Sequence, residues 1–246
     1  MDRSSFSGRI ALITGASGGI GQALARRLAA GGAALGLGYG ASGQAAEALA
    51  AEITAAGGRA IAGGADLRRP QAPGELVQAA AEALGPVEVL VSNAGLSRVQ
   101  PLDDMTAAQF DEMLAVNLRA PFLLAQRAVP SMRERGFGRI LFISSVAAFT
   151  GGIVGPHYAA SKAGLHGLTH YLASRLAASG VTVNALAAAL VDQTGMLPGD
   201  PAQLRRQVPV GRLGRPSEVV DLAAAILANA YLTNQVISLD GGIHPR

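Results

Sequence analysis

The sequence predicts a doubly wound α/β fold, in which helices cover both faces of a parallel sheet. Apolar runs of strand length recur along the chain, and Ala-rich segments with helical spacing separate them. Strands buried on both faces are continuous apolar runs, and each parallel crossover requires a helix. Seven strands are predicted: Ile10–Thr14, Ala33–Tyr39, Arg59–Gly63, Val87–Ser92, Arg139–Ser144, Val181–Leu186 and Gln235–Leu239.

The length and composition predict a single domain over residues 1–246. Half of the 246 residues are apolar and 15% are charged, so we expect some apolar surface to be buried between the subunits of an oligomer. The net charge of +3 comes from scattered arginines without a basic run, which argues against nucleic-acid binding despite a calculated pI of 9.8.

Cysteine is absent, which excludes disulfides and thiolate metal sites. The polar start of the chain lacks the apolar core of a secretory signal, and the longest apolar stretches are too short to span a bilayer. We therefore expect a cytoplasmic protein without a membrane partner.

The residues that follow each strand are the candidate site residues, because doubly wound sheets bind ligands at the carboxyl ends of their strands. "TGASGGIG", Thr14–Gly21, follows the first strand and leads into a helix, as a phosphate-binding turn would. Asp66 follows the third strand and "SNAG" the fourth. Each of these segments could separately be an ordinary turn.

The segment "HYAASKAG" contains Lys162, the only lysine in a chain whose other basic residues are arginine. Tyr158 precedes it by one helical turn, so the two side chains can share a helix face. A compact ammonium with rotatable donors suits a site that steers protons or binds hydroxyls better than a flat guanidinium does. The alternative is an ordinary amphipathic pair.

Taken together and in this order, these motifs resemble the short-chain dehydrogenase/reductase family over nearly the whole chain, especially bacterial 3-oxoacyl-carrier-protein reductases. The resemblance implies an extended Rossmann fold, an NAD(P)(H)-dependent oxidoreductase and a homotetramer or homodimer. It implies that Tyr158 is the general acid, that Lys162 lowers the pKa of Tyr158 and binds the ribose, and that Ser145 stabilises the substrate oxygen. Asn117 would hold a water beside the lysine. Ser144 is rejected, since the second serine of the pair matches the family.

The resemblance also implies the dinucleotide site and the substrate. We expect the cofactor to contact Gly15, Ser17, Gly18, Gly19, Ile20, Gly21, Gly40, Ser42, Asp66, Leu67, Asn93, Ala94, Gly95, Tyr158, Lys162 and Thr194. The second strand ends without the carboxylate that favours NAD, which favours NADP(H) slightly, although Gly18 stands where NADP-dependent members often have Arg. The apolar residues Val146, Phe149, Ile153 and Met196 predict an apolar carbonyl substrate.

Two departures from the family pattern affect the substrate side. Ala188 and Ala189 replace the usual Pro-Gly after the sixth strand, which puts the geometry of that loop in doubt. The segment around 190–210 is predicted to be a substrate lid, with a plain surface loop as the alternative. Carrier-protein reductases often have Arg where Ser179 stands, although Arg133, Arg135 and Arg175 are near, so an acyl carrier protein is an optional partner.

Ketone reduction with NADPH is the predicted reaction. The alternatives are an NAD-dependent secondary-alcohol dehydrogenase and a dinucleotide-binding sensor or scaffold without catalysis. His166 and His170 have the helical spacing of a zinc pair, but no third ligand accompanies them in the sequence, so we expect no metal site.

Overall fold

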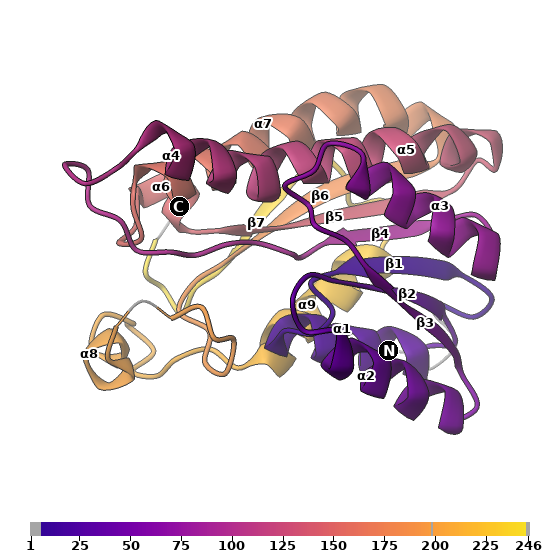
Figure 1. The fold of residues 1–246 in the computed structure, drawn as a ribbon, viewed down its shortest axis with the longest axis horizontal. Helices are drawn as coiled ribbons and strands as arrows, with labels where there is room; N and C mark the ends of the chain where they lie inside the picture. Colours follow the sequence, from indigo (N-terminus) through magenta and orange to yellow (C-terminus); the bar gives the residue numbers. More distant parts are fainter. Residues whose placement is uncertain (1–5, 198, 245–246) are drawn as a thin grey trace.

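The centre of the computed structural model, which describes residues 6–197 and 199–244, is a twisted parallel sheet (Figure 1). Its strands run in the order β3-β2-β1-β4-β5-β6-β7, and every neighbouring pair is parallel. The strands are β1 Ile10–Thr14, β2 Ala34–Tyr39, β3 Arg59–Gly64, β4 Val89–Ser92, β5 Gly138–Ser145, β6 Val181–Ala188 and β7 Val236–Leu239. The predicted doubly wound fold is confirmed.

Helices form a layer on each face of the sheet (Figure 1). One layer holds α1 Gly19–Ala30, α2 Gly43–Ala55 and α9 Pro216–Ala228. The other holds α3 Ala72–Leu84, α4 Ala107–Leu114, α5 Ala120–Glu134 and α7 Pro156–Leu176, with the short α6 Ala147–Thr150. Leu24, Leu28 and Ile13 pack in the first core, and Leu124, Phe142 and Leu165 in the second. Both faces of the five inner strands are thereby buried, which explains their continuous apolar runs, whereas the edge strands β3 and β7 are only partly buried.

Seven of the fourteen strand ends lie where they were predicted, and the other seven differ by one or two residues. Two differences matter for the site: β5 continues through Ser145, and β6 continues through Ala188. The β5 and β6 strands pair in register as far as Ser145 and Ala188. The candidate serine and the first residue of the altered loop therefore lie side by side at the carboxyl edge.

The segment around 190–210 includes the short helix α8 Pro201–Arg205, which lies apart from the sheet in Figure 1. Leu204, Val208 and Leu213 form a small apolar cluster of their own there. Residue 198 of the predicted lid, and residues 1–5 and 245–246 of the predicted domain, lie outside the described residues.

Candidate active site

The glycine-rich turn joins β1 to α1 at the carboxyl edge of the sheet. Gly15 has φ +65°, a conformation that favours glycine. A Cβ at Gly21 would lie 2.1 Å from the carbonyl oxygen of Gly15, and a Cβ at Gly19 would lie 2.3 Å from that of Gln193. Tight backbone packing therefore requires both glycines. No described side chain caps the start of α1, so its amides remain available to an anion.

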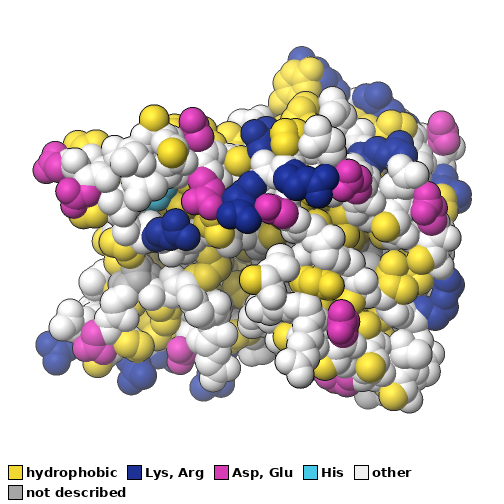
Figure 2. Space-filling view, viewed as in Figure 1, with side chains coloured by type: hydrophobic (Ala, Val, Ile, Leu, Met, Phe, Trp, Pro, Cys, Tyr) yellow, Lys and Arg dark blue, Asp and Glu magenta, His cyan; other side chains and the backbone are white. Residues whose placement is uncertain are grey.

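A cleft runs along this edge and opens between the two layers (Figure 2). Its larger cavity measures about 770 Å³. Most of the predicted cofactor residues line it: Gly15, Ser17, Gly18, Gly19, Ile20, Gly40, Asp66, Leu67, Asn93, Ala94, Gly95 and Thr194. Gly21 and Ser42 are not in its lining: Gly21 is buried in the first turn of α1, and Ser42 is the residue that precedes α2.

Asn93 joins the first and fourth strand ends. Its Nδ2 donates to the carbonyls of Thr14 (3.0 Å) and Gly15 (3.1 Å), while the amides of Asn93 and Ala94 both donate to Oγ1 of Thr14 at 3.1 Å. These bonds fix the floor of the cleft where the strand order reverses. The asparagine thus has a structural role that the sequence motif alone did not specify.

A second cavity of about 340 Å³ adjoins the first, and the two share Ile20, Asn93, Thr194 and Met196. Ser145, Tyr158 and Lys162 all line this second cavity. The serine comes from the end of β5, and the other two come from one face of α7. Residues from separate parts of the sequence are therefore brought together as predicted, directly beside the larger cavity.

The Tyr158 hydroxyl is in an apolar setting that opposes its ionisation. Burial raises the pKa of Tyr158, and a hydrogen bond with Ser145 lowers it by a smaller amount, since that bond favours the phenolate. The Ser145 hydroxyl also accepts a hydrogen bond of 3.2 Å from the amide of Ala147, which orients it.

Lys162 is buried, with 4% of its surface exposed, and its Nζ donates to the carbonyl of Ile143 at 2.9 Å. Burial lowers the pKa of Lys162 to about 8. The Nζ atom lies 5.7 Å from the centroid of the Tyr158 ring. In this structure burial is the largest influence on both groups, and it favours the neutral form of each.

Asn117 lies in a π-helical turn, Ala115–Arg119, between α4 and α5. Its carboxamide binds the backbone of Leu96: Oδ1 accepts from the amide at 2.8 Å, and Nδ2 donates to the carbonyl at 3.0 Å. Nδ2 also lies 3.2 Å from Oγ of Ser161. The side chain therefore holds the segment after β4 against α7, and a π-helical turn of this kind is frequent at functional sites.

Ser144 is buried, and its hydroxyl contacts α7. Its Oγ lies 3.2 Å from the carbonyl oxygen of Lys162 and 2.9 Å from Nε2 of His166. Nδ1 of His170 instead lies 2.7 Å from Oδ1 of Asn234. The two helix histidines thus have different partners, and no group of three metal-ligating side chains occurs in residues 6–197 and 199–244.

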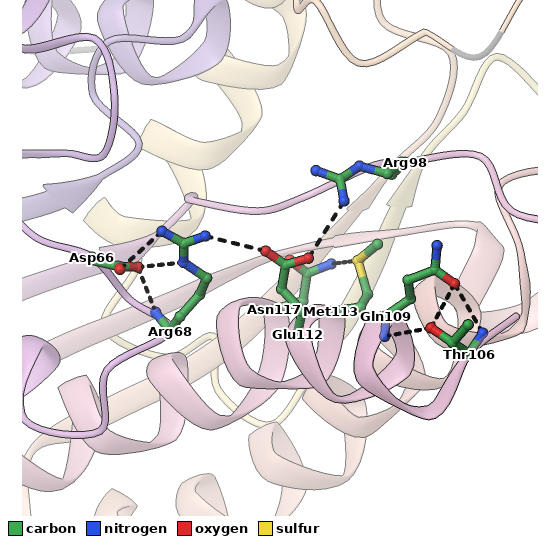
Figure 3. A network of polar contacts seen from close by, with 8 residues as sticks. All are labelled: Asp66, Arg68, Arg98, Thr106, Gln109, Glu112, Met113 and Asn117. Carbon is green, nitrogen blue, oxygen red and sulfur yellow. Dashed lines mark hydrogen bonds and ion pairs between the residues drawn. The ribbon is translucent and has the colours of Figure 1, made fainter.

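Sequence reasoning missed a charged network along the rim of the larger cavity (Figure 3). Arg68 binds both carboxylate oxygens of Asp66 at 2.8 and 3.0 Å, and it also reaches Glu112 at 3.4 Å. Arg98 approaches the other oxygen of Glu112 at 3.5 Å. Arg68 comes shortly after Asp66, and Arg98 shortly after the segment "SNAG". Their positions close to two predicted strand ends could have indicated that these arginines lie at the site.

The altered loop after β6 keeps its backbone hydrogen bonds. The amide of Val146 donates to the carbonyl of Ala188 at 3.3 Å, and that of Ala189 donates to Leu239 at 3.2 Å. Leu190 then has φ +47°, in the left-handed region that non-glycine residues rarely adopt. The backbone therefore turns at Leu190, directly after Ala188 and Ala189, the positions where the family pattern has proline and glycine.

The family model for short chain dehydrogenases matches residues 9–204. The chain is also 36% identical over 245 residues to a 3-oxoacyl-[acyl-carrier-protein] reductase from Synechocystis sp., covering 98% of each chain. It therefore belongs to the short-chain dehydrogenase/reductase family, whose members are NAD(P)-dependent oxidoreductases.

Two solved structures are similar over almost their whole length. A blue fluorescent protein from a metagenomic library, in complex with NADPH, has a TM-score of 0.92 and 37% identity, covering 98% of this chain and 100% of that one. A short chain dehydrogenase from Burkholderia cenocepacia, in complex with NADP, has a TM-score of 0.90 and 38% identity, covering 98% and 99%. Among the described residues, no helix has both the length and the apolar character needed to cross a membrane.

Proposed function

We propose that this oxidoreductase uses NADPH to reduce an apolar ketone to a secondary alcohol. The observation that carries the proposal is the placement of Ser145, Tyr158 and Lys162 on one small cavity that opens onto the glycine-lined cleft. The cleft residues fit a dinucleotide: Gly40 has no heavy atom within 4 Å of an added Cβ, and the uncapped start of α1 suits a pyrophosphate.

When bound, the dinucleotide supplies the hydride that the carbonyl carbon receives. The side chains supply the rest. Ser145 donates a hydrogen bond to the carbonyl oxygen as negative charge develops on it, and Tyr158 gives that oxygen its proton. Lys162 binds the ribose hydroxyls and restores a proton to the phenol. Asn117 keeps the segment after β4 in place beside this relay.

Turnover measurements with a panel of apolar ketones and NADPH test the proposal, followed through nicotinamide absorbance. We expect reduction with NADPH to exceed that with NADH. Faster oxidation of secondary alcohols with NAD⁺ would favour the alternative dehydrogenase. Cofactor binding without turnover on any ketone or alcohol would contradict the enzymatic proposal and favour a sensor.

The preference for NADPH over NADH can be tested with two substitutions that introduce opposite charges into the cleft. Gly18 has extended backbone, and a Cβ there would have only an ordinary contact at 3.5 Å with Gly15, so Gly18→Arg is tolerated. We expect Gly18→Arg to tighten NADPH binding by about tenfold, because a guanidinium can pair with the 2′-phosphate. Gly40→Asp is the matched control and should weaken NADPH binding relative to NADH. Calorimetric titration of both cofactors measures the change, and equal effects on both would contradict this placement of the phosphate.

We propose that the segment around 190–210 closes over the substrate. Met196 and Leu197 line the second cavity, and Ser97 Oγ lies 3.4 Å from the carbonyl oxygen of Met196 across the cleft. Leu204 and Val208 anchor the segment in its own apolar cluster.

A free ketone is the proposed substrate. An acyl group on a carrier protein is the second candidate, since Arg133, Arg135 and Arg175 are exposed.

We propose that the face of α4, α5 and α7 pairs two copies of the chain. A groove of about 710 Å³ on this face is lined by Leu114, Leu118 and Gly164, and it is bordered by the exposed rings of Phe122 and Tyr171. An exposed apolar surface of this kind is typical of an interface.

Gly167→Arg tests this assembly. Gly167 is exposed on α7 and has no heavy atom within 4 Å of an added Cβ, so the substitution leaves the folded chain intact. We expect the variant to be smaller than the wild type by light scattering, because the arginine would occupy the partner's place. Ala83→Arg, on the exposed side of α3, is the control. An unchanged mass for Gly167→Arg would exclude this face as the interface.

A further inference from the structure

The C-terminal turn, residues 240–244, has a fixed shape and lies beside the second cavity. Asp240 accepts hydrogen bonds from the amides of Gly242 (2.9 Å) and His244 (3.1 Å). Gly241 and Gly242 have φ +64° and +91°, conformations that glycine adopts without strain. The turn lies beside α6, where His244 contacts Phe149, and α6 follows the end of β5 at Ser145 (Figure 1). The turn therefore presents Ile243 in a defined direction.

One side of the turn packs against the proposed lid. The amide of Val210 donates to the carbonyl of Gly241 at 3.1 Å, and a Cβ added to Gly241 would lie 2.5 Å from Cγ1 of Val208. Ile243 packs on the apolar cluster of Leu204, Val208 and Leu213, and it also lines the second cavity. The same side chain thus contacts both the base of the lid and the space for the substrate.

The other side of the turn packs against α6, the short helix that follows β5. The ring of His244 stacks on that of Phe149, with centroids 5.2 Å apart and planes inclined by 15°. Phe149 in turn lies 4.7 Å from the ring of His166, which contacts Ser144 next to Ser145. Because both flanks of the turn are held, Ile243 has a rigid support on each side.

We propose that Ile243 is a specificity-determining residue that limits the size of the ketone substituent the second cavity admits. This inference rests on the proposed function, because it names the substrate class of the same site. The cavity of about 340 Å³ is bordered there by apolar side chains, including Leu190 and Leu197. A substituent large enough to reach this wall of the cavity therefore meets the Ile243 side chain, whereas a compact aliphatic substituent does not.

The first test compares ketones of increasing size. Ile243→Ala should raise kcat/KM for a bulky aryl ketone over that for a compact aliphatic ketone by about tenfold, since two more methylene equivalents can be buried. Ile243→Val should give a smaller shift of the same sign, which keeps the test valid if the alanine variant does not fold. Val210→Ala is the control, because Val210 is exposed in the same lid–tail contact but is absent from the cavity lining.

The second test needs no turnover. Unreactive carboxamides of increasing acyl size, titrated calorimetrically into the NADP⁺ complex, should show the same size-dependent gain in Ile243→Ala. A uniform change for all sizes, or the same change in Val210→Ala, would overturn the role of Ile243. If the size dependence appears with carboxamides while no ketone is reduced, the proposed function fails and the inference about the cavity wall stands.

Discussion

Tyr158→Phe is expected to lower the rate of ketone reduction by about 10² to 10⁴-fold, the usual contribution of a positioned general acid. The substitution removes the hydroxyl that shares a hydrogen bond with Ser145 and keeps the ring that lines the second cavity. Because the glycine-lined cleft is untouched, the dissociation constant for NADPH should be nearly unchanged. Steady-state kinetics and calorimetric titration measure the two quantities separately.

Tyr171→Phe is the matched control for this prediction. Tyr171 lies on the same helix, α7, but its ring is exposed and lies outside both cavities. Its hydroxyl should therefore be dispensable for turnover. A Tyr158→Phe enzyme that keeps most of its rate would show that the phenol does not transfer the proton.

Lys162→Met is expected to abolish turnover and to change how stability depends on pH. The pKa of Lys162 falls from 10.5 in the unfolded chain to about 8 in the buried site. Below pH 8 Lys162 is charged in both the folded and the unfolded protein, and burial of this charge destabilises the folded protein. Between pH 8 and 10.5 the unfolded chain binds a proton that the folded protein has released, so the wild type gains about 3 kcal/mol of stability as pH rises.

The methionine variant lacks this titration, so its free energy of unfolding should not show that rise. Denaturant unfolding of both proteins over the alkaline range measures the difference. If the free energies of unfolding of the two proteins changed with pH in parallel, the pKa of Lys162 would not be lowered by burial, and this prediction would be wrong. Lys162→Arg should also damage turnover and cofactor binding, because a larger, planar guanidinium would have to replace a buried amine whose Nζ donates to the carbonyl of Ile143 at 2.9 Å.

The fold and the centre of the site could be predicted because local patterns encode them. Seven apolar runs predicted the strands, and strand ends must meet at one edge of a parallel sheet, so Gly15 and Asn93 were expected to lie close together. The family resemblance added Ser145 to this edge. Helical spacing similarly placed Tyr158 and Lys162 on one face of α7. These relations depend only on element type and chain order.

Other features depend on how separate loops and helices approach one another, which no local pattern specifies. Arg68 reaches Glu112 only because α4 lies along the rim of the cleft. Ile243 enters the cavity lining only because the C-terminal turn returns to α6. The direction in which the pKa of Tyr158 is shifted could not be predicted from the sequence either. Burial is the largest influence on this pKa, and burial depends on how the site is packed.

The coupling of Tyr158 to Lys162 can be measured directly by titrating the phenol in the NADP⁺ complex. Phenolate absorbance is recorded against pH, and the spectrum of Tyr158→Phe is subtracted to isolate this one of the four tyrosines. With cofactor binding verified by calorimetry, we expect Tyr158 in the wild-type complex to ionise at lower pH than Tyr158 in the complex of Lys162→Met, because a charged amine beside the phenol favours the phenolate. Identical titrations in the two complexes would contradict the proposed role of the lysine.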